Sequence, residues 1–271
     1  MLGQAKRLFE LNSLLDEPKS KKNGAKIISV SSGKGGTGKS FISSNLAVTL
    51  AEAGNKVLLI DLDLNFANLS TMLNINSSQN IYHYLTYNKS LSDVISKFSN
   101  NLNVVLGESG KIDHPNFSFD KSTLLLSELT NISDQYDFII IDTASGIDNG
   151  SLNILINSDE IILVTTPEPT AVMDGYVILK MLKNNGASNS INVIINKCFN
   201  ENDASNTFEN LNKAAKHFLK NEISYMGKIN FNEDVVRSIQ NQSILKLQDK
   251  NSEISLQIEK ISKKFEKHTI G

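Results

Sequence analysis

Eight consecutive residues, Gly33–Ser40, have the types and the spacing that bind phosphate groups. Their sequence, GKGGTGKS, matches the pattern G-x-x-x-x-G-K-[ST] and places Gly38, Lys39 and Ser40 at its last three fixed positions. Glycines let backbone N–H groups converge on phosphate oxygens because no Cβ atom is in the way. Lys39 would then reach the β- and γ-phosphates of a nucleotide, and the Ser40 hydroxyl would bind Mg²⁺. The loop therefore predicts a site for ATP and Mg²⁺.

Three aspartates that follow predicted strands extend this chemistry. Asp61 and Asp63 end the segment KVLLIDLD, and Asp142 ends the apolar run FIIID. Burying an unpaired carboxylate is costly, but a carboxylate that holds Mg²⁺ through water is compensated. A single Asp after a strand is more often a helix N-cap. Three of them in register with a phosphate loop, at the sheet edge where ligands bind, instead predict a role in the site.

Apolar segments that suit buried strands alternate with helical patterns along the rest of the chain. The predicted strands are 26–30, 56–61, 102–106, 137–141, 160–165, 191–196 and 223–229. The helix after the phosphate loop has one apolar face, and Gly54 is placed to end it with a left-handed cap. Near-continuous apolar strands imply that helices cover both faces of a sheet. The pattern predicts an α/β fold with a doubly wound, mostly parallel sheet flanked by helices, as in P-loop NTPases.

The chain is expected to have two parts. Residues 1–25 are predicted to form an N-terminal amphipathic appendage, with Leu8, Leu11 and Leu15 on one helical face and a solvated linker after Pro18. The alternative is that this helix docks on the domain that follows. Residues 26–271 are assigned to a P-loop ATPase domain that includes a C-terminal amphipathic helix.

Composition excludes several classes of protein. The 271 residues include 27 basic and 29 acidic side chains, so no strong net charge favours nucleic acid, and no specific nucleic-acid partner is expected. A single cysteine, Cys198, rules out an intrachain disulfide framework and a cysteine-rich metal site. No segment approaches the ~18 apolar residues of a membrane-spanning helix, and the first residues lack the apolar core of a signal peptide. These features predict a cytoplasmic protein.

A second lysine, Lys34, stands directly after the first glycine of the loop. The form K-G-G-x-G-K-[ST] resembles the deviant Walker A motif of the MinD/ParA family. The resemblance implies an ATPase that forms a homodimer when ATP is bound, in which Lys34 reaches the partner's nucleotide and stabilises phosphoryl charge as an arginine finger does. The alternative is that Lys34 is a solvated loop charge.

The same resemblance assigns roles within the site. The implied catalytic residues are Asp63, Lys34 and Lys39. The implied metal-binding residues are Ser40, Asp61 and Asp142. Among these, Asp63 would orient the attacking water and Asp142 would be the Walker B acid. Residues 61–70 and 142–148 look like the switch I and switch II segments of the family.

Nucleotide contacts are also implied outside the fixed motif positions. Asn196 and Lys197, which end the segment VIINK, match the family's adenine-contacting Asn and its basic neighbour. The implied nucleotide-binding residues are Gly33, Lys34, Gly35, Gly36, Thr37, Gly38, Lys39, Ser40, Phe41, Asn196 and Lys197. One departure concerns the adenine pocket, because this chain has Asn230 after GKI where the family usually has Pro.

Two further segments favour one branch of the family. VTTPEPTAVMDGY, residues 164–176, is similar to the FlhG (FleN, YlxH) branch of flagellar-number regulators, which shows TTPEPT at this point. That branch begins with the element D-Q-A-x-x-L-R, and here Gln4, Ala5 and Leu8 are in register, with Gly3 for Asp and Phe9 for Arg. The resemblance implies control of flagellar number or placement, with an FlhF-like GTPase bound through residues 1–25.

The last predicted helix allows two interpretations. Ile254, Ile258, Ile261 and Phe265 share one face, and lysines lie elsewhere on the helix. Residues 254–268 could lie on the inner membrane, as a peripheral contact of the ATP-bound dimer. The alternative is a terminal helix packed on the sheet.

Other functions remain as alternatives to flagellar regulation. They are a MinD-type division-site ATPase, a ParA-type DNA-segregation ATPase that would need a basic dimer surface, and a scaffold or transcriptional antagonist that binds nucleotide without needing turnover. A metal-cluster carrier is disfavoured by the lone Cys198.

Overall fold

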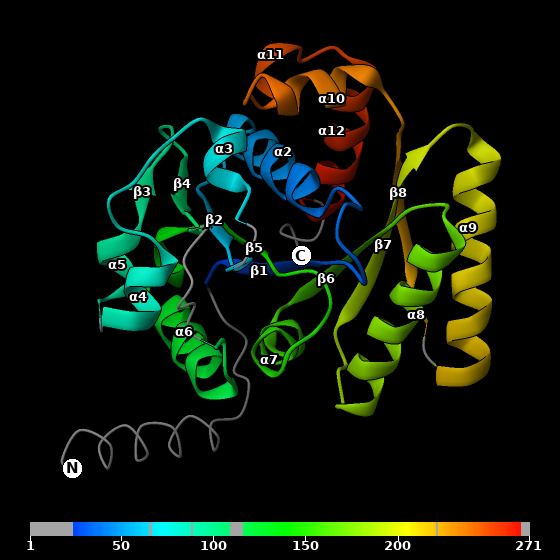
Figure 1. Ribbon diagram of the computed structural model, residues 1–271, viewed down its shortest axis with the longest axis horizontal. Coiled ribbons are helices and arrows are strands. Elements are labelled where there is room, and N and C mark those ends of the chain that lie inside the picture. The colour runs from blue at the N-terminus through cyan, green and yellow to red at the C-terminus, as the bar shows by residue number, and fades with distance from the viewer. Residues whose placement is uncertain (1–23, 65–66, 88, 109–115, 221, 267–271) are drawn as a thin grey trace.

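The computed structural model describes residues 24–64, 67–87, 89–108, 116–220 and 222–266. Within them, eight strands form one central sheet in the order β3-β4-β2-β5-β1-β6-β7-β8 (Figure 1). The strands are β1 Lys26–Ser31, β2 Val57–Asp61, β3 Ser96–Lys97, β4 Leu102–Val105, β5 Phe138–Asp142, β6 Glu160–Thr165, β7 Ser190–Cys198 and β8 Ser224–Asn230. Neighbouring strands are parallel except for β3 and β4.

The predicted parallel α/β sheet is confirmed. Each predicted strand corresponds to one strand of the structure, and only the edge strand β3 has no counterpart in the prediction. A strand of two residues is too short to show a hydrophobic pattern. β2 and β5, in the middle of the sheet, are buried along their whole length, as expected for strands with helices on both faces.

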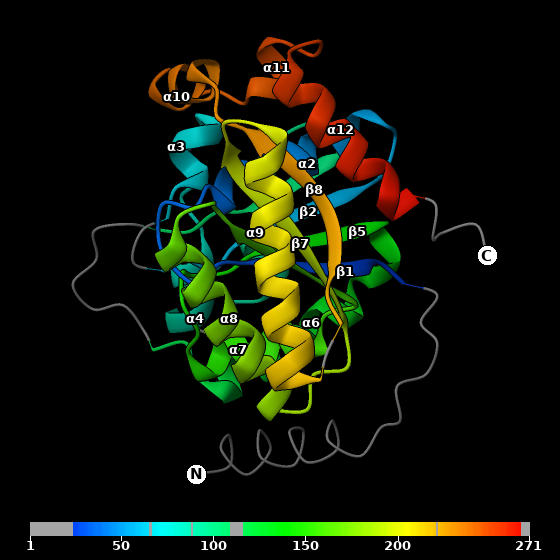
Figure 2. The ribbon, with the colours of Figure 1, turned by 90° about the vertical axis from the view of Figure 1, so that its right-hand side faces the viewer.

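Helices cover both faces of this sheet. The helical elements are α2 Lys39–Glu52, α3 Leu69–Leu73, α4 Ile81–Tyr87, α5 Leu91–Val94, α6 Phe119–Asn131, η1 Ser133–Gln135, α7 Asn149–Asn157, α8 Pro169–Asn184, α9 Glu201–Ala214, η2 Ala215–Leu219, α10 Glu233–Gln240, α11 Leu245–Gln248 and α12 Glu253–Glu266. One face packs on α2, α3, α11 and α12, and the other packs on α4 to α9 (Figures 1 and 2).

The helix on which the site depends is α2. It begins directly after Gly38, whose φ of 92° is a left-handed conformation that glycine adopts without strain. Most of its residues are buried because the sheet lies on one side and the C-terminal helices on the other. After the helix ends, Gly54 has a φ of 97° and donates its N–H to the carbonyl of Ala51 at 3.1 Å. The predicted glycine cap is therefore confirmed.

The C-terminal helix α12 packs on the domain through its apolar face. Ile254, Ile258, Ile261 and Phe265 are all buried in the core beside α2 and β8. The packed alternative is confirmed, because the side chains that lipid would take up already lie in the protein core. A membrane contact of residues 254–268 in the ATP-bound dimer stays a prediction. Residues 267 and 268, at the end of the proposed membrane segment, lie outside the described residues.

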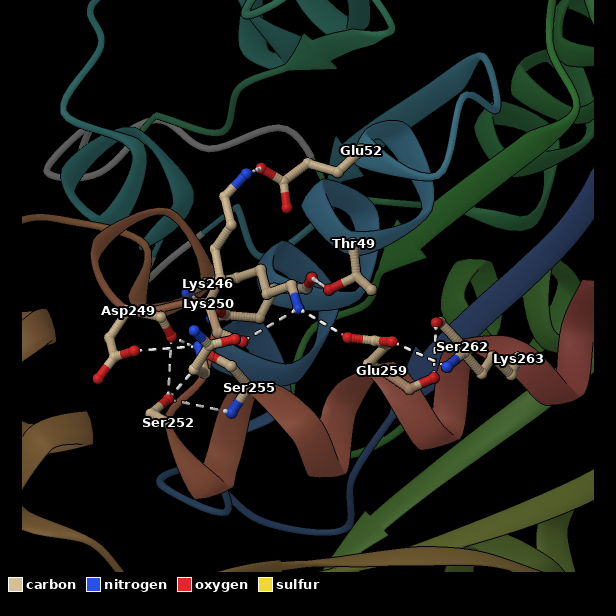
Figure 3. Close-up of polar contacts among 12 residues, drawn as sticks. Thr49, Glu52, Lys246, Asp249, Lys250, Ser252, Ser255, Glu259, Ser262 and Lys263 are labelled. Atoms are coloured by element: carbon tan, nitrogen blue, oxygen red, sulfur yellow. Dashed lines mark hydrogen bonds and ion pairs between the residues drawn. The ribbon is translucent and has the colours of Figure 1, made fainter.

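Polar contacts join the C-terminal helices to α2 (Figure 3). Lys246 in α11, with a side chain only 6% exposed, pairs with Glu259 of α12 at 3.1 Å. The backbone N–H of Lys246 donates to Oδ1 of Asn45 in α2 at 3.0 Å. Lys250 pairs with Glu52 at the end of α2 at 2.6 Å. These contacts hold α11 and α12 against the helix that starts at the phosphate loop.

The leading segment lies almost entirely outside the described residues, which begin at Gly24. Ala25 joins the domain by donating its N–H to the carbonyl of Ser133 at 2.8 Å. In the part of the chain that the structure describes, each helix is too short or too polar to span a membrane.

Candidate nucleotide-binding site

The phosphate loop connects the end of β1 to the start of α2. Gly36 and Gly38 have φ values of 78° and 92°, which side chains rarely allow. A Cβ atom at Gly38 would lie 2.1 Å from Nδ2 of Asn196 in β7. At Gly33 it would lie 2.4 Å from the backbone of Asp174 in α8. The glycines of the motif therefore serve backbone conformation at some positions and close packing at others.

Lys39 points into the core, where it meets the predicted Walker B acid. Its Nζ donates to Oδ1 of Asp142 at 2.9 Å, and the two side chains are 6% and 0% exposed. Ser43, one turn further along α2, donates its hydroxyl to the same carboxylate oxygen at 3.0 Å. Ser43 is not among the site residues predicted from the sequence, although a polar residue four positions after Lys39 on a buried helical face is a usable signal.

Asp61 and Asp142 end adjacent strands and are register partners across the β2–β5 pair. Both are fully buried. Asp61 accepts the backbone N–H of Asp63 at 3.0 Å and that of Leu69 at 3.3 Å. Burial, followed by the charge of Asp142, raises the pKa of Asp61 to about 8, and Lys39 and the two backbone hydrogen bonds oppose this rise. The two carboxylates together form a buried acidic pair that a cation would stabilise.

The residues at this position fit a Mg²⁺ ion. Oδ2 of Asp142 is buried and has no hydrogen-bond partner among the described residues, so a water molecule of a hydrated metal would satisfy it. Within the same residues, no group of three or more His, Cys, Asp or Glu side chains is arranged to hold an ion by itself. This agrees with Mg²⁺, which keeps several waters and takes ligands from substrate phosphates. The assignment of Ser40, Asp61 and Asp142 to the metal stays a prediction.

Asn196 and Lys197, at the end of β7, hold the phosphate loop from the opposite side. Nδ2 of Asn196 donates to the carbonyl of Thr37 at 2.7 Å, and Nζ of Lys197 donates to the carbonyl of Gly36 at 2.8 Å. Lys197 has a φ of 57°, and a left-handed non-glycine residue of this kind is often found at a binding site. Both residues therefore lie at the loop, while their contact with adenine stays a prediction.

A cleft of about 680 Å³ opens over the loop, which is a suitable size for a small-molecule site. Its lining includes the predicted residues Lys34, Gly35, Gly36, Thr37, Gly38, Lys39, Ser40, Phe41, Asp63, Asn196 and Lys197. Gly33 is not among the lining residues because it packs on α8. Asp61 and Asp142 are buried behind the lining.

The cleft also has an apolar wall, whose residues are not among those predicted from the sequence. Phe231, Val235, Val236 and Ile239, from α10 and the residues before it, line this wall. The ring of Phe231 lies 5.2 Å from that of Phe199, centroid to centroid. The apolar spacing in EDVVRSIQ is visible in the sequence, but spacing alone does not indicate that the face lines a cleft. A wall of this kind suits an aromatic base.

Asn230 has a structural role that proline could not fill. Its backbone N–H donates to Oε1 of Gln257 in α12 at 2.9 Å, and proline has no N–H to donate. Its side-chain amide bonds Glu253, also in α12. Because Asn230 lines the cleft, these contacts connect the wall of the site to the C-terminal helix.

Lys34 lies at the surface and contacts its own subunit. Its Nζ donates to Oε2 of Glu168 at 2.8 Å and to Oγ1 of Thr170 at 3.3 Å. The side chains of Lys34 and Glu168 are 38% and 59% exposed. The hydrogen bond from Lys34, together with its charge, holds the pKa of Glu168 below its usual value. The contact of Lys34 with a partner subunit stays a prediction.

This arrangement defines a class of protein. A strand leads through a glycine-rich loop into a helix, the loop lysine meets a strand-terminal aspartate, and a cleft lies over the loop. These are the features of a P-loop nucleotide-binding domain.

Comparison with known proteins agrees with this class. A family model described as an AAA domain matches residues 25–197. The chain is 31% identical over 266 residues to the flagellum site-determining protein YlxH of Helicobacter pylori, which covers 97% of this chain and 90% of the relative. It is 29% identical over 240 residues to the antiactivator FleN of Pseudomonas aeruginosa, covering 89% and 86% of the two chains.

The fold is similar to that of the septum site-determining protein MinD from Pyrococcus horikoshii, solved as a complex with Mg-ADP. The TM-score is 0.76 at 25% identity, and the match covers 91% of this chain and 98% of the other. The chain therefore belongs to the MinD/ParA family of P-loop ATPases, in the branch that includes FleN and YlxH. The family and branch predicted from the loop and from TTPEPT are confirmed.

Proposed function

We propose that the protein is an ATP- and Mg²⁺-dependent switch, in which ATP joins two copies of the chain and hydrolysis separates them. The observation that carries this proposal is the different placement of the two loop lysines. Lys39 is buried on Asp142, where it can serve only the nucleotide of its own subunit. The side chain of Lys34 lines the cleft and is 38% exposed, so a second subunit can reach it.

Each polar residue of the site has a proposed task in hydrolysis. Lys39 and the loop N–H groups bind and orient the phosphates, and Asp63, which lines the cleft, orients the attacking water. Ser40, Asp61 and Asp142 would hold Mg²⁺, which when bound neutralises charge on the phosphates. Lys34 from the partner stabilises the charge on the transferred phosphoryl group.

Lys34→Ala tests the switch. We expect ATP binding to the monomer to stay within about threefold of wild type, because the own-subunit contacts of Lys34 are with Glu168 and Thr170. ATP-dependent dimerisation should weaken at least ~10-fold and turnover should fall ~10²-fold or more, since an arginine-finger contact contributes on this scale or above. Sedimentation with a non-hydrolysable ATP analogue and a phosphate-release assay measure both effects.

Lys213→Ala is the matched control, because Lys213 is also an exposed lysine paired with a glutamate, in α9. It should leave binding, dimerisation and turnover at wild-type values. If Lys34→Ala dimerises and hydrolyses ATP as wild type does, the switch proposal is wrong.

The proposed output of the switch is control of flagellar number or placement. The support is the similarity to a flagellum site-determining protein and an antiactivator over most of the chain. The proposed partner is an FlhF-like GTPase of the signal-recognition type, bound through residues 1–25.

A pull-down tests this partner. With ATP present, the full chain should capture the GTPase, and a chain lacking residues 1–23 should capture at least ~10-fold less. The deletion leaves Ala25 and β1 in place, so the fold of the domain is retained. Equal capture by both chains would assign the contact to another surface, and no capture by either would contradict the proposed partner.

A further inference from the structure

The TTPEPT segment that marks the branch lies directly against the phosphate loop. It joins β6 to α8 and includes Glu168 and Thr170. The loop and α8 are so close that a Cβ atom at Gly33 would lie 2.4 Å from the backbone of Asp174. Across this contact, Glu168 and Thr170 both accept hydrogen bonds from Nζ of Lys34. Lys34, which we expect to act on a second subunit, is therefore bound by residues of its own subunit.

The side chain of Glu168 does not cap the helix that it precedes. Glu168 is the N-cap residue of α8, a position where Ser, Thr, Asp and Asn side chains usually accept an N–H from their own helix. Its carboxylate makes no such capping bond within the described part of the chain, and it contacts Lys34 instead. Pro169 follows at the first helical position, where its fixed φ favours the helix start. The helix therefore begins without help from the carboxylate.

We propose that Glu168 is a positioning residue that retains Lys34 within its own subunit until the nucleotide of a second subunit attracts it. This inference rests on the proposed role of Lys34 in the dimer. Glu168 offers one negative charge and Thr170 one hydroxyl, whereas a triphosphate offers several negative charges. The ion pair is exposed on both sides, so it contributes little and separates readily.

The same competition gives the switch a direction. A diphosphate presents less negative charge than a triphosphate, so after hydrolysis Glu168 competes better for Lys34. A symmetric dimer releases one Lys34 from each subunit, and its formation therefore breaks two Lys34–Glu168 pairs. Glu168 raises the threshold for dimerisation and favours separation once ATP has been hydrolysed.

The test is Glu168→Gln, which removes the charge and keeps the shape of the side chain. If each exposed pair opposes dimerisation by about 1.4- to 5-fold, the loss of two pairs should lower the dimer Kd by about 2- to 25-fold with a non-hydrolysable ATP analogue. Binding of the analogue to the monomer should stay within about twofold of wild type. The gain should shrink between about 50 and 500 mM salt, because exposed charges are screened. Sedimentation measures the dimer Kd.

Glu209→Gln is the matched control, since it removes one carboxylate from an exposed Lys–Glu pair in α9 and should leave the dimer Kd unchanged. Dimerisation of Glu168→Gln that is unchanged or weaker than wild type overturns the inference. The double variant Lys34→Ala/Glu168→Gln should behave as Lys34→Ala alone, and a gain that persists in it also overturns the inference.

Failure of the inference and failure of the proposed function give different results. If Lys34→Ala weakens the dimer and Glu168→Gln has no effect, the function stands and only the role of Glu168 is wrong. If Lys34→Ala itself has no effect on dimerisation or turnover, the proposed function fails, and the role of Glu168 fails with it.

Discussion

Lys39→Ala should abolish ATP binding and lower the stability of the folded protein. We predict that the ammonium of Lys39 is the positive charge that reaches the β- and γ-phosphates, so the Kd for ATP should rise at least ~100-fold. Its pair with Asp142 is buried, and removing one partner of a buried ion pair costs about 3–5 kcal/mol. Titration calorimetry and thermal unfolding measure the two effects separately.

A second buried lysine, Lys246, separates the loss of ATP binding from the general loss of stability that follows when a buried lysine is removed. Lys246 has the same 6% side-chain exposure as Lys39 and pairs with Glu259 at 3.1 Å, but it does not line the cleft. Because Glu259 is 35% exposed, Lys246→Ala should destabilise the fold less than Lys39→Ala does, and it should keep the Kd for ATP within about threefold of wild type. If Lys39→Ala is folded at the temperature of the titration and binds ATP as wild type does, the P-loop assignment is wrong.

Local pattern was enough to predict most of the fold, because every strand except β3 is an apolar segment and helical patterns connect the parallel strands. β5 illustrates this, since FIIID is buried over all five residues. The edge strand β3 is set by pairing with β4 rather than by its two residues, so the sequence carries no local signal for it. The sequence also left open whether α12 packs on the domain or on a membrane, for a related reason. An apolar helical face must be buried, but the sequence does not state whether protein or lipid covers it.

The residues of the site also differ in how far the sequence alone reveals them. The loop, Asp61, Asp63 and Asp142 are recognisable because each belongs to a short motif with a fixed position at the end of a strand. The partner of Lys34 is not recognisable, because Glu168 is 134 residues away and nothing in its spacing refers to the loop. Contacts of this kind arise from strand order, which brings the segments after β1 and β6 side by side.

Several residues that we propose for the chemistry adopt arrangements that cost the folded protein stability. Asp61 and Asp142 bring two carboxylates together in the core, and Lys39 balances one positive charge against them. Lys197 has a left-handed backbone at the loop. Such features are typical of functional sites, where stability is exchanged for a preorganised arrangement of charge. A substitution that removes the repulsion between the two carboxylates should therefore raise stability and at the same time remove function.

Asp61→Asn should show both consequences. The amide keeps an oxygen that can accept the N–H of Asp63 or of Leu69, but it removes the negative charge beside Asp142. Without Mg²⁺ and at pH 8, we expect the variant to be more stable by about 2 kcal/mol, with a Tm about 4–8 °C above wild type. With Mg²⁺, turnover should fall ~100-fold or more, because a neutral amide supports the metal site poorly.

The stability gain should depend on pH in a defined direction. The pKa of Asp61 is raised from 3.8 to about 8 in the folded protein, so the folded state binds this proton more tightly than the unfolded chain does. The contribution of Asp61 to stability is therefore fully present below pH ~4 and is lost as the pH rises through about 8. The amide that replaces the carboxyl group does not titrate, so the Tm difference between Asp61→Asn and wild type should be small at pH 5 and should grow up to pH 8.

Thermal unfolding in EDTA between pH 5 and pH 8 measures this dependence. Glu209→Gln serves as the control, because Glu209 is an exposed carboxylate and its replacement should give no Tm difference that grows with pH. An Asp61→Asn variant that is less stable than wild type at pH 8, or whose Tm difference is constant over the range, would show that Asp61 is held as a well-compensated charge. A Tm difference that grows with pH would instead show that the Asp61–Asp142 pair destabilises the fold when no cation is bound.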